Sequence, residues 1–285
     1  MRRFLGLFVV VALVGLGYYF RMDIAGLLIG EGTSEAQPTL TASVCADLVV
    51  PPAPATLNLG VVLDPTTSTA ASFTRNVVAA LVTQLGNFLP DKPQPATGSP
   101  AIDGINLRIK QVGANPFAYG APDTYLQIPG VRGLPPRPGV ECLDSGIYQQ
   151  WSALEKQWST EYAAAMATRD KAISALRGMK LTDSNSGIRA ALSALAVAMP
   201  GTEHSAYLVA SDFEENVKPQ TAGSLAGHPL ILITACPSGN ASECMANVES
   251  FGTWAVDNLD APAPQLFRPE NTTTAIARLF EEAQQ

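Results

Sequence analysis

Short apolar segments alternate along this chain with segments in which apolar residues recur every three or four positions. Residues 57–63 form a nearly continuous apolar run, which is typical of a strand covered on both faces. Residues 68–89 follow with their apolar side chains on one helical face. Because such alternation builds a mostly parallel sheet with helices on both faces, the pattern predicts one doubly wound α/β domain over residues 57–285.

The same alternation predicts the remaining elements of this domain. Further strands are expected at 105–112, 125–128, 206–210, 230–235 and 265–267, and further helices at 186–198, 244–259 and 273–283. No internal repeat is visible at periods of about 20 to 50 residues, which excludes solenoids and propellers.

A longer helical pattern interrupts this order between residues 146 and 180. Its apolar side chains recur near the helical period, which predicts one amphipathic helix roughly 50 Å long at about 1.5 Å per residue. Two interpretations fit the face that carries Trp151 and Trp158. Either this face is an arm that binds a partner, or it packs on the domain itself.

Residues 4–20 contain no charged side chain and follow Arg2 and Arg3. They are long enough to cross a membrane and exceed the apolar part of most signal peptides. We expect a retained single-pass anchor within residues 1–30, with a cytoplasmic N-terminus and the domain outside the cell membrane. A cleaved signal peptide, for which no small-residue cleavage site follows, and a buried core helix are the alternatives. Thr, Ala, Ser and Pro dominate residues 31–56, which predicts an extended stalk.

All four cysteines lie beyond the apolar segment, in agreement with an oxidising, periplasmic or surface location. Cys236 and Cys244 bracket a short polar loop, so we expect them to form a disulfide, which leaves Cys45 to pair with Cys142. A zinc site is disfavoured, because the chain has no Cys-x-x-Cys motif and only two histidines.

Charge and motifs narrow the class of function. Acidic residues outnumber basic ones by 25 to 18, and the net charge of −7 leaves no basic field for nucleic acid. No Gly-x-Ser-x-Gly elbow or Walker loop occurs, and neither His204 nor His228 stands in a recognisable triad motif. Thr66 also stands where a phosphatase of the haloacid dehalogenase type needs a second aspartate. These observations favour a binding protein over an enzyme.

Oxygen-bearing side chains stand where two expected strands end and where a helix begins. Asp64, Thr66 and Ser68 follow the first strand, Asp212 follows a later strand, and Ser186 opens a helix. Because ligands of open α/β sheets bind outside the carboxyl ends of the strands, we expect these side chains to gather at one edge. Carboxylate and hydroxyl oxygens suit a hard divalent cation. The alternative is a metal-free loop whose hydroxyls only cap the next helix.

These motifs resemble the metal-ion-dependent adhesion site of von Willebrand factor type A domains. That family has Asp-x-Ser-x-Ser after its first strand, and the loop that begins at Asp64 reads Asp-Pro-Thr-Thr-Ser. Its second loop has Thr or Ser five residues before an Ala-Leu pair, as Ser186 stands before Ala191. Asp212 resembles the aspartate of the family's Thr-Asp-Gly or Ser-Asp-Gly strand end.

The resemblance covers residues 57–285, with 146–180 as an insertion. Three positions depart from the family's pattern: Thr66 replaces Ser, Ser186 replaces the commoner Thr, and Phe213 replaces Gly. Both hydroxyls survive these replacements, so the resemblance still implies metal coordination. The resemblance implies Mg²⁺, or Mn²⁺, held by Asp64, Thr66, Ser68, Ser186 and Asp212.

The resemblance also implies a binding mechanism without turnover. One position on the metal stays open for a Glu or Asp carboxylate of a protein partner, and the surrounding loops supply specificity. A metal-free structural module of an envelope complex is the alternative, followed by a secreted hydrolase. We expect Asp64 to lie in a surface loop, so that replacing it with Ala leaves the fold intact.

Overall fold

The computed structural model divides the chain into two units, Met1–Val44 and Cys45–Gln285. The structure describes residues 48–285 except for 66–68, 70, 90–97, 113–122, 144–145, 182–186, 200–202, 216–220, 226 and 237–238. The apolar segment 4–20 therefore lies outside the described residues. No helix in the described part is both long enough and apolar enough to cross a membrane.

Within the described residues, one sheet of six strands has the order β3-β2-β1-β4-β5-β6. The strands are β1 (Thr56–Leu63), β2 (Gly104–Gln111), β3 (Asp123–Ile128), β4 (Ser205–Ser211), β5 (Leu230–Thr234) and β6 (Gln265–Phe267). Neighbouring strands are parallel except for β3, which is antiparallel to β2. The predicted α/β class with a mostly parallel sheet is confirmed.

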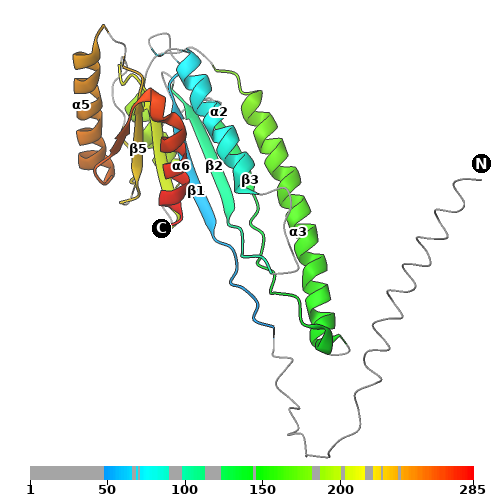
Figure 1. Cartoon of the computed structure of the whole chain (residues 1–285). Helices are drawn as coiled ribbons and strands as arrows, with labels where there is room; N and C mark the ends of the chain where they lie inside the picture. Colours follow the sequence, from blue (N-terminus) through cyan, green and yellow to red (C-terminus); the bar gives the residue numbers. More distant parts are fainter. Residues whose placement is uncertain are drawn as a thin grey trace, which may run out of the picture. The chain divides into compact units, whose positions relative to one another are not determined.

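Helices cover both faces of this sheet (Figure 1). The helices are α2 (Ala71–Phe88), α3 (Gly146–Arg177), α4 (Ile188–Ala198), α5 (Ala241–Leu259) and α6 (Thr272–Ala283), with 3₁₀ turns at Val140–Cys142 and Pro269–Asn271.

Two apolar cores lie on opposite faces of the sheet, because successive side chains of a strand point to opposite faces. Val61 of β1 belongs to the core under α2, α3 and α6, whereas Val62 belongs to the core under α4 and α5. Leu208 and Val209 of β4 divide in the same way. Both strands are therefore buried on both faces, as their continuous apolar runs predict.

The long helix α3 lies along α2 and the edge strand β3 (Figure 1). Its aromatic face is buried, because Trp151 and Trp158 are only 2% and 3% exposed. The Trp151 indole donates a hydrogen bond of 2.9 Å to the carbonyl of Pro135, in the segment that follows β3. Of the two interpretations of this face, packing on the domain is correct, and the partner-binding arm is wrong for these two tryptophans. The helix also ends at Arg177 rather than at residue 180.

The described end of the predicted stalk lies against the domain. Leu48 packs on the apolar core, and the Ala55 N–H donates to Asp103 Oδ1 at 2.8 Å. The Ala55 carbonyl accepts a 2.8 Å hydrogen bond from the N–H of Gly104, at the start of β2. The packed structure therefore begins before residue 57, while residues 31–47 lie outside the described part.

Gly60, in the middle of β1, occupies a place where no side chain fits. A Cβ there would lie 2.6 Å from Cδ1 of Tyr207 and 2.8 Å from Cδ2 of Leu195. The Tyr207 ring is held by a 2.6 Å hydrogen bond from its hydroxyl to the Met199 carbonyl. Burial raises the pKa of Tyr207 to about 12, so this hydroxyl keeps its proton at every physiological pH. The ring cannot move aside without breaking that hydrogen bond.

We predict that Gly60→Ala lowers the free energy of unfolding by about 1–3 kcal/mol, because it overpacks the core. Gly86 of α2 is the matched control, since a Cβ there meets nothing within 4 Å. Gly86→Ala should raise the same free energy by about 0.5–1 kcal/mol, because glycine is a poor helix former. Urea unfolding of both variants shows whether each free energy of unfolding falls or rises. A loss of stability in both variants, or in neither, would contradict this packing.

Candidate metal centre

The carboxyl ends of β1 and β4 meet at the centre of the sheet. The strand order reverses there, because β2 lies on one side of β1 and β4 lies on the other. The Asp64 N–H donates to the Ala210 carbonyl at 3.0 Å, and the Ala235 N–H beyond β5 donates to the Ser211 carbonyl at 2.9 Å. This edge is the topological switch point, where open α/β sheets bind their ligands.

Asp64, the first residue after β1, is buried with 0% exposure. Its Oδ2 accepts hydrogen bonds from the hydroxyls of Ser211, at 2.6 Å, and Thr69, at 3.3 Å. Its main-chain carbonyl accepts a 3.0 Å hydrogen bond from Thr74 in the first turn of α2. The expectation of a surface-loop carboxylate is therefore wrong, because the end of β4 and the start of α2 enclose Asp64.

Asp212 follows β4 directly and is 3% exposed. Its Oδ1 accepts a 3.1 Å hydrogen bond from the N–H of Glu214, which fixes the turn at this strand end. Its main-chain oxygen lies 3.2 Å from Sγ of Cys244. Asp212 is therefore held by the loop that follows it and by the start of α5.

Phe213 has a left-handed backbone, with φ of 61°. This region is unfavourable for a bulky side chain, and glycine is the residue that normally occupies it. The ring is 4% exposed and packs on Phe251 of α5, with 5.0 Å between the ring centroids. Its N–H also donates to Ser211 Oγ at 2.8 Å. These contacts offset the strain and hold the sharp turn after Asp212.

Glu215 connects this turn to the start of α4. Its Oε1 accepts a 3.0 Å hydrogen bond from the N–H of Arg189, and its Oε2 pairs with the Arg189 guanidinium. The guanidinium lies over the rings of Phe251 and Trp254, at 5.9 and 5.6 Å from their centroids. A carboxylate at the N-terminus of a helix is favourable, because the helix dipole is positive there. The first turn of α4 is thereby fixed beside the end of β4.

A disulfide joins Cys236, beyond β5, to Cys244, in the first turn of α5, with 5.5 Å between the Cα atoms. This predicted pair is confirmed. Cys142 is also disulfide-bonded, whereas Cys45 lies outside the described residues. Because Cys244 contacts the Asp212 carbonyl, the Cys236–Cys244 bond supports the loop around the candidate site.

Of the five predicted metal ligands, the structure describes Asp64 and Asp212 and brings them to the ends of adjacent strands. Thr66, Ser68 and Ser186 lie outside the described residues.

Sequence reasoning placed Ser211 beside Asp212 at this strand end and considered Thr69 only as a cap of the next helix, and it included neither residue among the predicted metal ligands. Their only signal was position, because each is a hydroxyl residue in the loop or strand end that carries a predicted ligand. It missed Glu215, whose partner Arg189 stands 26 residues earlier in the chain. No local pattern links these two residues.

Asp64, Asp212 and the neighbouring hydroxyls form a donor set of oxygen atoms alone. Mg²⁺ is usually bound through one or two carboxylates and keeps several waters, so this donor set fits such an ion. Within the described ranges, no group of three or more His, Cys, Asp or Glu side chains is placed to hold a metal ion. A metal at this edge would therefore use hydroxyl oxygens in addition to the two carboxylates.

No protein-family model and no curated protein matches this chain. Among solved structures, it is similar to proximal thread matrix protein 1 from the mussel byssus, with 8% identity and a TM-score of 0.39 over 82% of this chain and 49% of that chain. It is also similar to the pilus adhesin SpaC from Lactobacillus rhamnosus GG, with 9% identity and a TM-score of 0.36 over 83% of this chain and 31% of that chain. The chain thus spans less than half of either protein, and TM-scores this low do not establish a shared fold.

We predict that Phe213→Gly is more stable than Phe213→Ala by about 1 kcal/mol, because only glycine adopts a positive φ without steric conflict. Both variants lose the contact with Phe251, so both should fall about 3 kcal/mol or more below the parent protein. Urea unfolding ranks the parent protein and the two variants by their free energy of unfolding. An alanine variant as stable as the glycine variant would show that the left-handed turn after Asp212 is not formed.

Proposed function

We propose that this chain is a membrane-tethered, extracytoplasmic binding module that engages a carboxylate of a protein partner through Mg²⁺ or Mn²⁺. One observation carries the proposal: Asp64 and Asp212 directly follow the two strands between which the strand order reverses. The resemblance to von Willebrand factor type A domains supplies the remaining ligands, Thr66, Ser68 and Ser186.

The backbone at Phe213 supports this assignment independently of the carboxylates. In the von Willebrand factor type A pattern, glycine directly follows the aspartate that corresponds to Asp212. Phe213 has a φ of 61°, which is the conformation that glycine adopts without strain. The departure from the family's sequence pattern is thus compatible with the family's expected turn.

The side chains around Asp64 would prepare the site for an ion. Hydroxyls of Ser211 and Thr69 donate to its carboxylate and fix its rotamer, so little ordering remains when a ligand binds. A bound Mg²⁺ would supply positive charge and one exchangeable water position. Asp64 and Asp212 would hold the ion, and a carboxylate of the partner would replace that water.

The tether and the compartment are supported by separate features. The charge-free segment 4–20 after two arginines supports a single-pass anchor. The Cys236–Cys244 disulfide supports an oxidising compartment, because cytosolic thiols are kept reduced. Together they favour a domain on the outer side of the cell membrane.

We predict that Mg²⁺ binds the purified domain and raises its melting temperature. At a concentration about 100-fold above Kd, the ion should add about 2.7 kcal/mol to the free energy of unfolding. For a domain of this size, that gain corresponds to roughly 5–10 °C. Calorimetric titration and thermal unfolding with Mg²⁺, Mn²⁺ and EDTA measure it.

Asp64→Asn and Asp212→Asn should each abolish this shift, because each keeps an oxygen acceptor but removes a negative ligand. Asp257→Asn is the matched control, since it makes the same charge change at an exposed position of α5. An equal shift in all four proteins, or none in the parent, would refute a metal at this edge.

A partner held through the metal should be captured by the immobilised domain in Mg²⁺ and released by EDTA. Asp212→Asn should fail to capture it, because the ion that bridges the two proteins is lost. Capture that survives EDTA and the substitution would instead favour the metal-free structural module. Comparing the captured proteins by mass spectrometry separates these two functions.

A further inference from the structure

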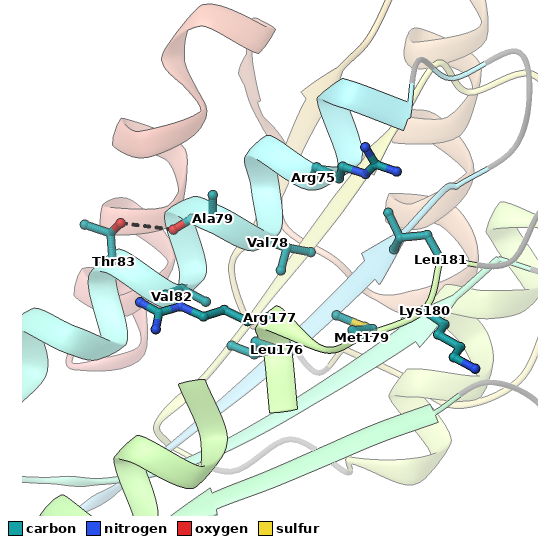
Figure 2. Close-up of a pocket in the computed structure, with 10 residues that line it drawn as sticks. All are labelled: Arg75, Val78, Ala79, Val82, Thr83, Leu176, Arg177, Met179, Lys180 and Leu181. Atoms are coloured by element: carbon teal, nitrogen blue, oxygen red, sulfur yellow. Dashed lines mark hydrogen bonds between the residues drawn. The ribbon is translucent and has the colours of Figure 1, made fainter. Parts of the chain in front are cut away.

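A groove of about 820 Å³ lies between α2 and the end of α3, and neither Asp64 nor Asp212 is among its lining residues. Five apolar side chains line its floor, from both helices and from the segment that follows α3: Val78, Val82, Leu176, Met179 and Leu181. Figure 2 shows these side chains facing one another across the groove. The volume is within the roughly 300–1,000 Å³ of ligand sites in proteins.

Three cations, Arg75, Arg177 and Lys180, also line this groove, and none of its other described lining residues is acidic. All three are exposed, and among the described residues none of their side chains makes an ion pair or a hydrogen bond. The described residues therefore leave a local positive field in the groove.

The cations are spread along the groove rather than gathered at one end. In Figure 2, Arg177 points toward Val82 and Thr83, whereas Lys180 points in the opposite direction. Arg75 lies about two helical turns before Thr83 on α2, or roughly 12 Å along the helix axis. A ligand that pairs with all three must carry negative charges at several points along its length.

We infer that this groove binds an acidic amphipathic peptide segment of a protein partner. Its apolar side chains contact the floor between α2 and α3, and its Glu or Asp side chains pair with Arg75, Arg177 and Lys180. A fatty acid has a single charged group, so it could not pair with all three cations. The inference goes beyond the metal site, because no group in the groove requires an ion.

The test uses the purified parent protein in EDTA at about 0.15 M salt, so that a metal contributes nothing. The probe is a fluorescein-labelled 12-residue peptide of alternating Leu and Glu pairs, which places each type on one helical face. Two control peptides replace every Glu with Lys or every Leu with Ser. Fluorescence anisotropy should show saturable binding of the Leu/Glu peptide and binding at least about tenfold weaker for both controls.

Arg177→Glu with Lys180→Glu should weaken binding of the Leu/Glu peptide about five- to tenfold, because two favourable charge pairs become repulsive. Lys156→Glu with Lys171→Glu is the matched control, since it reverses two exposed charges of α3 outside the groove. The control pair should bind as the parent does. Urea unfolding of both double variants shows that each is folded.

Equal binding of the Lys peptide, or equal loss in both double variants, would overturn the inference. Saturable binding of a fluorescent long-chain fatty acid, with no binding of the Leu/Glu peptide, would also overturn it and indicate a lipid-like ligand. Failure here leaves the metal proposal standing, because every measurement is made in EDTA. Failure of Mg²⁺ binding likewise leaves the groove unaffected.

Discussion

The hydrogen bond from Ser211 to the buried carboxylate of Asp64 holds the centre of this structure together. A buried carboxylate without partners is strongly destabilising, so its acceptors must be satisfied wherever it is enclosed. Ser211 and Thr69 satisfy Oδ2, and Thr74 satisfies the main-chain carbonyl. The end of β1 is thereby tied to the end of β4 and to the start of α2. Everything proposed for the metal centre depends on that junction.

Three further connections bring the surrounding elements to the same edge. Phe213 packs on α5 and turns the chain after Asp212, Glu215 holds the start of α4, and the Cys236–Cys244 disulfide joins the end of β5 to α5. Each uses a different kind of interaction, namely apolar packing, a charged hydrogen bond and a covalent bond. These connections fix the described part of this edge, and a binding site held in place in advance lowers the entropy that binding must overcome.

The strands and most helices could be predicted from the sequence, because β1 and β4 are buried on both faces and read as continuous apolar runs. The positions of Asp64 and Asp212 at strand ends could be predicted too, since each residue directly follows such a run. The burial of Asp64 could not be predicted, because Ser211, which donates to its carboxylate, is 147 residues away in the chain. The sequence could not decide whether Trp151 packs on the domain or on a partner, since an amphipathic pattern does not identify the surface that covers it. The groove cations come from α2, from α3 and from the segment after α3, and only the fold brings them together.

The central claim is that a divalent ion binds where β1 and β4 end. Paramagnetic broadening of amide NMR signals by substoichiometric Mn²⁺ tests it most directly, because the broadening falls steeply with distance from the ion. The signals of Asp64, Asp212 and Phe213 should disappear first, while those of Gly86 and Leu266 persist. Broadening that begins elsewhere, for example at the exposed Glu281 of α6, or that affects all signals equally, would contradict the claim.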